Sequence, residues 1–254
     1  MLIRFFKAMG LIVIFSISLC SLYLVNLFLM KPISIDHYLG KNLIVGLVDS
    51  PEAMTYLGLF DGINWLTKHN SRISIPEVGD LEEGIKSSKK SLKMLNRYKD
   101  KSLSHNQKIT KSIAIFDTEN GLRQMEDFPH HDFPLNQIGG DHLNTIGFMS
   151  DMHPIRNISE AEDFIKRTDL IKEKYSGLLH ELELQAESGI YPPVFVFEHV
   201  IKQLNEFIDF DLEEHPLYTQ FIKKIGELDI SNEKTESLKA KIEISINNSV
   251  TPGF

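Results

Sequence analysis

Apolar residues recur at intervals of three and four positions along most of the chain after Pro32. One such series places its apolar residues on one helical face and lysines on the other: Leu81, Ile85, Leu92, Leu95 and Tyr98. A longer series predicts one continuous helix that Gly189 ends: Phe164, Ile171, Tyr175, Leu178, Leu182 and Ala186. No alternating strand pattern with hairpin turns is present. The pattern therefore predicts an all-α fold of antiparallel helices joined by short connections.

Helix-start signals agree with this periodicity. Three serines are expected to cap the N-termini of helices: Ser50 before Pro51, Ser104 in a capping box with Gln107, and Ser159 in a capping box with Glu162. Pro193 and the pair His215-Pro216 are expected to begin two further helices. A last amphipathic run covers residues 238–250, and the sequence alone does not show what covers its apolar face. Residues 61–80, around Trp65, are predicted to form a polar loop.

The N-terminal region has a different pattern, because residues 8–30 carry no charge. As a helix this stretch would be about 35 Å long, enough to span a bilayer. Arg4 and Lys7 precede it, so the positive-inside rule places the N-terminus in the cytoplasm. We predict a bacterial inner-membrane protein with residues 1–31 as stub and transmembrane anchor. Residues 32–254 would then form a helical domain facing the periplasm or the outside.

Two forms of cleavage are the alternatives to this anchor. A cleaved signal peptide favours a shorter apolar core and small residues at its exit, whereas residues 27–30 are bulky. A lipoprotein signal would use Cys20, but Leu19 is a poor residue before a lipidated cysteine. The anchor is therefore the preferred interpretation, and either alternative also places the remaining chain outside the cytoplasm.

Composition excludes several functions. The chain has 254 residues and a formal net charge of −8, which argues against nucleic-acid binding because phosphate contacts need a basic face. Cys20 is the only cysteine, so the chain forms no intramolecular disulfide and no cysteine-based metal site.

The segment Phe128–Pro154, FPHHDFPLNQIGGDHLNTIGFMSDMHP, has the highest density of candidate binding residues. Long connections inside compact domains are usually functional or disordered, and this one has many apolar residues to bury. Its amides and imidazoles can donate to and accept from a peptide backbone, and adjacent glycines let a ligand approach closely. The predicted substrate-binding residues are Asn136, Gln137, Gly139, Gly140, His142 and His153. The alternative is structural: the glycines only make a turn, and the amides satisfy buried backbone groups around it.

A metal site in this segment is a weaker hypothesis. His130, His131, Asp132 and His142 could converge on an ion, but adjacent side chains in extended backbone point to opposite faces. The chain also contains no HExxH motif. The text beginning at His180, HELEL, lacks the second histidine that would place two imidazoles on one ion. We predict no catalytic residues, no metal ligands and no cofactor in this chain.

Four blocks carry a family resemblance: SPEAMTYLGLFD (50–61), the segment 128–154, GIYPPVFVFEHVIKQL (189–204) and HPLYTQFIKKI (215–225). In this order and spacing they resemble the bacterial domain-of-unknown-function family 885. Members of that family are similar to helical zinc metallopeptidases, with an HExxH helix and a glutamate ligand in the C-terminal half. The resemblance thus implies the N-terminal half of a helical zincin-like fold, with zinc expected only in the other half.

The present sequence stops at Phe254, before that half begins. The resemblance therefore implies a membrane-anchored, substrate-side part of a metallopeptidase-like protein that is not catalytic on its own. Its expected partners are the membrane, through residues 8–30, and a peptide ligand or a separately encoded C-terminal half. The alternatives are a non-catalytic extracytoplasmic module that binds peptides or proteins, and a decayed remnant of the enzyme.

Overall fold

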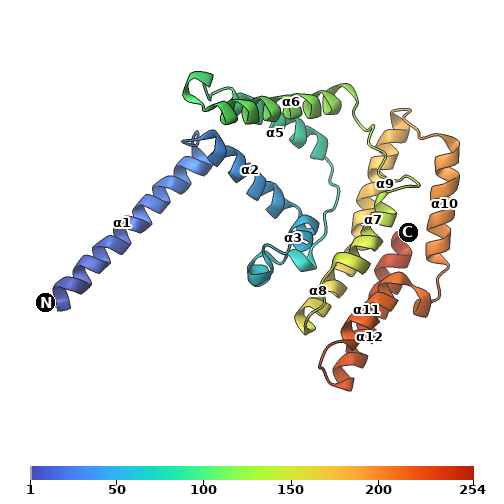
Figure 1. The fold of residues 1–254 in the computed structure, drawn as a ribbon. Helices are drawn as coiled ribbons and strands as arrows, with labels where there is room; N and C mark the ends of the chain where they lie inside the picture. Colours follow the sequence, from blue (N-terminus) through green and yellow to red (C-terminus); the bar gives the residue numbers. More distant parts are fainter. Residues whose placement is uncertain (1) are drawn as a thin grey trace. The chain divides into compact units, whose positions relative to one another are not determined.

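The computed structural model describes residues 2–254, and its regular elements in this range are helices (Figure 1). No strand occurs among residues 2–254, which confirms the predicted all-α class. The α-helices are α1 (Leu2–Leu29), α2 (Ile35–Asp49), α3 (Pro51–Leu57), α4 (Asn64–Thr67), α5 (Asp80–Leu95), α6 (His105–Asp127), α7 (Asp141–Gly147), α8 (Ile158–Asp169), α9 (Ile171–Glu187), α10 (Val194–Ile208), α11 (Pro216–Gly226) and α12 (Asn232–Ser245).

Helix α1 contains the predicted membrane segment. Its stretch Met9–Leu29 is long and apolar enough to cross a membrane, by length and composition, and none of it is buried within the protein. The side chain of Asn26 closes the end of this helix. Its Nδ2 donates to the carbonyl of Lys31 at 2.9 Å, and its Oδ1 accepts from the amide of Ile33 at 3.0 Å. An apolar N-terminal helix of this kind can serve as a signal sequence or as a membrane anchor.

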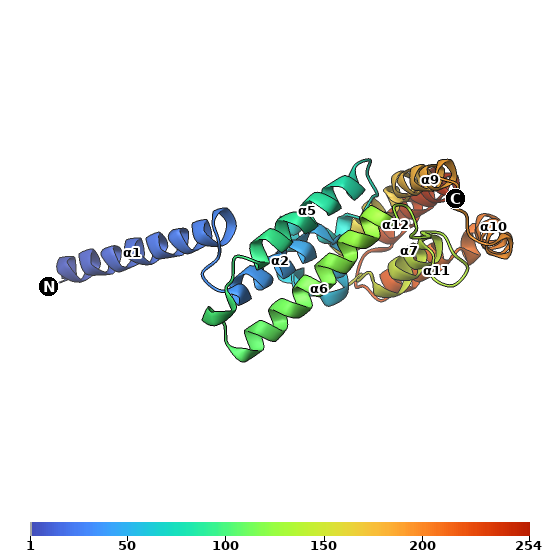
Figure 2. The ribbon, with the colours of Figure 1, turned by 90° about the horizontal axis from the view of Figure 1, so that it is seen from above.

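The chain divides into two compact units, and the first comprises residues 2–46 and 83–126. Within it α5 and α6 lie side by side (Figures 1 and 2), linked by an ion pair of 2.6 Å between Lys89 and Glu126. The start of α2 and the end of α5 share a small apolar cluster of Ile35, Tyr38, Leu95 and Tyr98. The predicted capping box before α6 is confirmed. Ser104 N donates to Gln107 Oε1 at 3.0 Å, and Gln107 N donates to Ser104 Oγ at 3.3 Å.

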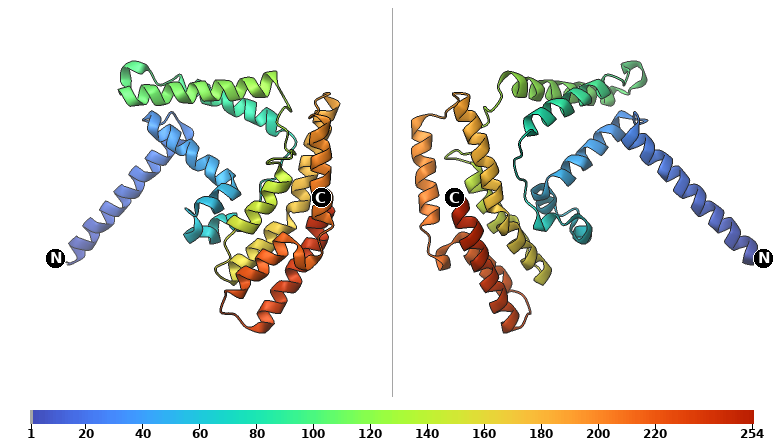
Figure 3. Two further views of the ribbon diagram at one scale, coloured as in Figure 1. Left: turned by 45° about the vertical axis from the view of Figure 1, so that its right-hand side comes forward. Right: turned by 180° about the vertical axis from the view of Figure 1, so that it is seen from behind.

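The second unit comprises residues 47–82 and 127–254 and holds the main core. The core lies between α8, α9, α11 and α12 (Figure 3). Within it the rings of Phe164 and Phe221 are 5.2 Å apart. The apolar face predicted over residues 238–250 is covered by this chain itself. Leu238 and Ile242 on α12 are both 0% exposed, and Val250 in the following turn is also 0% exposed. The apolar side chains of this core are therefore buried against other residues of the same unit.

Two of the predicted helix starts in this unit are confirmed. Ser50 caps α3 by accepting from Ala53 N at 3.3 Å, and Pro51 occupies the first turn. His215 caps α11, because its Nδ1 accepts from Leu217 N at 3.3 Å. The ring of His215 is 3% exposed and contacts that of Phe207, and this burial lowers its pKa to about 4.

Two other predictions in this unit are wrong. The cap of α8 is Asn157, whose Oδ1 accepts from Glu160 N at 3.0 Å, so Ser159 lies inside the first turn. The single long helix predicted over residues 164–186 is divided at Leu170 into α8 and α9. Ser245 Oγ donates to Asp169 Oδ1 at 2.6 Å and holds the end of α8. The apolar spacing continues across this break, which is why the pattern shows one helix.

Candidate functional site

The segment Phe128–Pro154 is irregular only in its first half. Residues 128–140 lack regular structure apart from turns, whereas α7 and a π-helical turn, Phe148–Met152, follow directly. The prediction of a loop over residues 141–152 is therefore wrong. Ile146 and Met149 are spaced by three and turn one helical face toward the core, where they are 8% and 0% exposed. Polar residues surround these two positions in the sequence, so their helical spacing did not lead to a helix prediction.

Asn136 shapes the irregular half through its own side chain. Its Oδ1 accepts from Ile138 N at 3.1 Å and from Gly139 N at 2.9 Å, and its Nδ2 donates to the carbonyl of Phe133 at 3.3 Å. The amide of Gly140 donates to the carbonyl of Asn136 at 3.2 Å. The side chain thus replaces backbone hydrogen bonds in the manner of an Asx turn.

Of the two adjacent glycines, only Gly140 lies so close to other atoms that a side chain would not fit. A Cβ on Gly140 would lie 2.5 Å from Asn136 N and 2.8 Å from His142 Nδ1, whereas one on Gly139 would meet nothing within 4 Å. Gly140 therefore lets the loop fold against the first turn of α7.

His142 and Gln137 tie this loop to α10 through Gln203. The amide nitrogen of Gln203 donates to the carbonyl of Gln137 at 3.2 Å, which orients the side-chain oxygen toward His142. His142 Nε2 lies 3.0 Å from that oxygen, and His142 is 3% exposed. Because the oxygen only accepts, Nε2 carries the proton in the neutral ring. Nδ1 then keeps a lone pair, and it is buried without a hydrogen-bond partner.

His153 lies apart from these residues, in the core of the second unit. Its Nε2 is 2.9 Å from the carbonyl of Asn70, and its ring meets that of Phe164 edge-on at 5.1 Å. Burial lowers the pKa of His153 to about 3, and the positive charge of Arg167 adds to this effect. Lys224 Nζ also donates to the backbone carbonyl of His153 at 2.8 Å. These contacts join α8 and α11 to the segment around Asn70.

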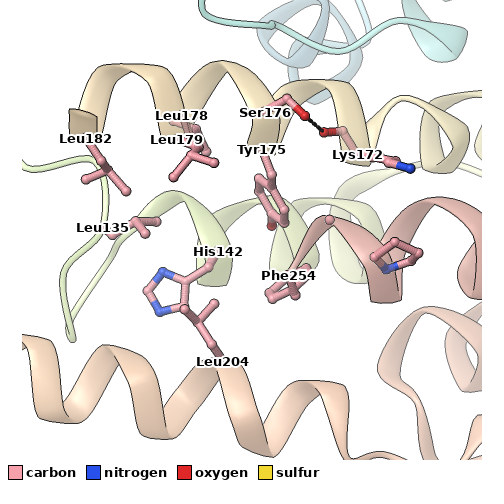
Figure 4. A pocket seen from close by; sticks show the side chains of 12 residues that line it. Leu135, His142, Lys172, Tyr175, Ser176, Leu178, Leu179, Leu182, Leu204 and Phe254 are labelled. Carbon is pink, nitrogen blue, oxygen red and sulfur yellow. Dashed lines mark hydrogen bonds between the residues drawn. The ribbon is translucent and has the colours of Figure 1, made fainter. Parts of the chain in front are cut away.

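Two adjoining cavities flank the loop in the second unit. The larger, about 320 Å³, lies between the loop, α7, α9 and the C-terminal turns, with His142 in its wall (Figure 4). The smaller, about 230 Å³, lies between the loop, α9 and α10, and its wall is almost wholly apolar. Three leucines line both cavities: Leu135 from the loop, Leu182 from α9 and Leu204 from α10. The structure thus brings His142 to a cavity wall, while Asn136, Gln137 and the two glycines hold the loop that carries Leu135.

Figure 4 shows the side chains that line the larger cavity. Leu178, Leu179 and Leu182 project from α9 on one side, and Tyr175 and Phe254 lie close together beside them. The rings of Tyr175 and Phe254 are 4.7 Å apart. Burial raises the pKa of the Tyr175 hydroxyl, which stays protonated at neutral pH.

The sequence pattern did not identify these apolar cavity residues as part of a site. Those on α9 belong to an ordinary amphipathic stripe, which usually packs in a core. A signal was present on α10, whose first turns read Val194-Phe195-Val196-Phe197. Four consecutive apolar residues in a helix face more than one direction. Here Val196 is 7% exposed, while Phe197 borders the smaller cavity.

The histidines and acids of the segment have separate partners. His130 Nδ1 lies 3.5 Å from Glu181 Oε2, and His131 Nδ1 lies 2.9 Å from the carbonyl of Pro129. Asp141 lies 3.6 Å from Lys174 Nζ, which also donates to the carbonyl of Ser74 at 3.3 Å. Within residues 2–254, no group of three or more histidines, cysteines or acids is arranged to hold a metal ion.

Comparison with solved structures shows a related fold. The chain is similar to the "putative lipoprotein from Colwellia psychrerythraea", with 19% sequence identity and a TM-score of 0.64. The match covers 82% of this chain and 38% of that protein, so the present chain spans well under half of its relative.

Sequence comparisons identify the family. No curated protein sequence matches this chain. Residues 51–254 match the model of a family described as bacterial protein of unknown function (DUF885). This range includes most of the four blocks that carried the resemblance, both cavities and the whole of the main core. The chain therefore belongs to the DUF885 family.

Proposed function

We propose that the second unit is the substrate-side binding part of a DUF885 protein and holds apolar side chains of a peptide. The observation that carries this proposal is the pair of adjoining cavities on either side of Leu135. Each is large enough for one large apolar side chain, and burying such a side chain contributes about 1.5–3 kcal/mol.

The predicted binding residues have defined roles in this proposal. Asn136, Gly139 and Gly140 fix the loop, and Gln137 and His142 secure it to α10 through Gln203. Because these amides and Nε2 are already hydrogen-bonded within the protein, ligand affinity would come chiefly from apolar contact. His153 would act at a distance, by holding the core on which the loop rests.

The same proposal assigns peptide hydrolysis to a part of the protein outside this chain. Residues 1–31 would anchor the protein in the bacterial inner membrane, and residues 32–254 would face the periplasm or the outside as an antiparallel helical domain. The zinc implied by the family resemblance would be held in a C-terminal half, either continuous with this chain or separately encoded. This chain alone would bind peptide without cleaving it.

A free-standing binding or interaction module is the second candidate. It is favoured by the filled core of the second unit, where Phe164, Leu217, Phe221, Leu238 and Ile242 are each 0% exposed. A core of this kind does not require a second polypeptide in order to fold. The two candidates share the binding site and differ in whether catalysis follows.

Binding is tested with matched pentapeptides that vary only in the central residue, titrated into the detergent-solubilised full chain by calorimetry. Peptides with central Phe or Leu should bind at least about 10-fold more tightly than the Ala peptide. Leu179 lines the larger cavity only and is 57% exposed, so Leu179→Glu should weaken this preference without unfolding the protein. Ile244 on α12 is 59% exposed and lines neither cavity, so Ile244→Glu is the matched control. Equal affinities for all peptides would refute the binding proposal.

Catalysis is tested separately, by following cleavage of the same peptides with and without added zinc. The proposal expects no hydrolysis by this chain. Zinc-dependent cleavage by the pure chain would refute the assignment of catalysis to another part of the protein, and would leave the binding result unaffected.

A further inference from the structure

We propose that residues 56–66 form a second membrane contact, in which apolar side chains of the second unit enter the headgroup region of a bilayer. The segment contains the end of α3, a 3₁₀ turn and most of α4, and its large apolar side chains other than Phe60 are exposed. Exposure ranges from 40% for Ile63 to 76% for Trp65. The apolar patch consists of Tyr56, Leu57, Leu59, Ile63, Trp65 and Leu66.

The backbone beneath this apolar patch is held in place by polar side chains. Asn64, between two residues of the patch, donates from Nδ2 to Asp163 Oδ2 at 3.0 Å and accepts at Oδ1 from Asn70 N at 3.2 Å. His69 is 0% exposed, and its Nδ1 lies 2.7 Å from Thr67 Oγ1. These bonds hold the backbone on either side of Trp65, whose side chain is exposed. Outward presentation of the patch is therefore a property of the fold.

Charge around the patch favours an anionic lipid surface. Asp61 is the only acid in residues 56–68, and Arg156 NH2 donates to its Oδ2 at 2.7 Å while also pairing with Glu160. Lys68 and Arg72, beyond the end of α4, are exposed basic residues. Each basic residue near an anionic bilayer contributes about 1 kcal/mol to attraction. Trp and Tyr together with basic residues are the composition found where proteins meet headgroups.

If α1 anchors the protein, the chain keeps the patch close to a bilayer, and the inference rests on that role of α1. Residues 30–55 connect α1 to the patch, and α2 makes up 15 of them. A helix of that length spans about 22 Å and the remaining residues at most ~40 Å, so the patch is tethered within about 60 Å of the membrane. Tethers of this length give effective concentrations of the order of mM, at which weak partitioning is enough for stable contact.

Trp65 makes the inference directly testable, because it is the only tryptophan of the chain. The full chain is reconstituted in phosphatidylcholine–phosphatidylglycerol vesicles, with and without lipids brominated on the acyl chain near the headgroup. Insertion predicts blue-shifted Trp65 emission, quenching by the brominated lipids and protection from acrylamide. Since α1 keeps the protein on the vesicle in every case, the readout reports on the patch alone.

Variants separate the apolar and electrostatic contributions. Leu59→Ser combined with Leu66→Ser should reduce quenching by brominated lipid, whereas Val78→Ser, at an 82% exposed position outside the patch, should not. Lys68→Glu should reduce quenching in vesicles that contain phosphatidylglycerol and leave it unchanged in pure phosphatidylcholine.

Two results would overturn the inference. Emission of Trp65 that is open to acrylamide and insensitive to brominated lipid would mean that the patch stays in water. Protection from both quenchers would mean that a protein covers the patch, either a second copy or another chain, and dilution would distinguish these. Neither result would bear on peptide binding at the two cavities, which involves none of these residues.

Discussion

Replacing Arg167 by methionine should destabilise the second unit. Arg167 lies on α8 and is 0% exposed. Its Nε donates to the carbonyl of Arg72 at 2.5 Å, and its NH2 donates to Thr55 Oγ1 at 2.9 Å and to the carbonyl of His69. The guanidinium also lies over the ring of Phe148, 5.2 Å from its centroid. One side chain thus joins α8 to three points in residues 55–72.

The expected loss follows from opposing contributions. A hydrogen bond from a charged donor contributes about 1.5–3 kcal/mol, and Arg167→Met removes three of them. The carbonyl of His69 keeps the amide of Arg72 as a second donor, and the Thr55 hydroxyl keeps its bond to the carbonyl of Pro51. Methionine also avoids the desolvation of a buried cation, which costs several kcal/mol. That cost is real here, because burial lowers the pKa of Arg167 to about 10 although Glu52 and Asp163 supply opposite charge. The balance is a net loss of about 2–4 kcal/mol of unfolding free energy.

Urea unfolding of the detergent-solubilised chain, followed by circular dichroism, measures this loss. Hydrogen exchange adds a local readout, because amides of residues 55–73 should exchange faster in the variant than those of α11 and α12. Lys166→Met is the matched control, since Lys166 is one residue away and its side chain is exposed where it pairs with Asp163 at 3.0 Å. This control should cost less than about 1 kcal/mol.

An unchanged midpoint in Arg167→Met would refute this reasoning. It would mean that the desolvation cost of the guanidinium equals the value of its hydrogen bonds, as happens in some buried ion pairs. Equal losses of unfolding free energy in Arg167→Met and Lys166→Met would refute it as well, because the buried position of Arg167 would then have no effect on stability.

Two further predictions concern pH and the loop. Burial holds the pKa of His153 at about 3 and that of His215 at about 4, so the unfolded chain binds protons at a higher pH than the folded one. Stability should therefore be full above about pH 6.5 and fall toward pH 4 by about 1.4 kcal/mol per pH unit for each histidine; a thermal midpoint that is flat across this window would contradict the assignment. Gly140→Ala should cost about 1–3 kcal/mol, because the new Cβ would clash with Asn136 and His142. Gly139→Ala, with open space around it, should stay within about 0.5 kcal/mol, and equal effects of the two substitutions would refute the proposed close approach.

Local signals in the sequence predicted local structure well. Ser50, Ser104 and His215 act at the helix starts where their side chains were expected, because capping depends on residues only two or three positions apart. The break at Leu170 was not predictable in this way. At this break Ser245 Oγ donates to Asp169, and the two residues lie 76 positions apart in the chain, which no local pattern shows.

In the candidate site, too, local features could be predicted from the sequence and contacts between distant residues could not. The turn around Asn136 and the two glycines could be inferred from residue type, because an Asx turn is local. The cavities could not, because their walls are leucines that look like core residues until the distant helix α10 is placed. His153 is of a residue type that often binds ligands, but it lies in the core. Its ring contacts the carbonyl of Asn70, which is 83 positions away in the chain.

The long chain separation between Arg167 and its acceptors also has a consequence for biosynthesis. His69 precedes Arg167 by 98 positions, and the intervening chain includes all of α5 and α6. At translation rates of about 5–20 residues per second, the turn around His69 exists for roughly 5–20 s before its partner helix is made. During that interval the carbonyl of Arg72 lacks the Nε donor of Arg167, and the carbonyl of His69 has only the amide of Arg72. Until α8 emerges, the nascent chain therefore lacks the side chain that joins residues 55–72 to the core of the second unit.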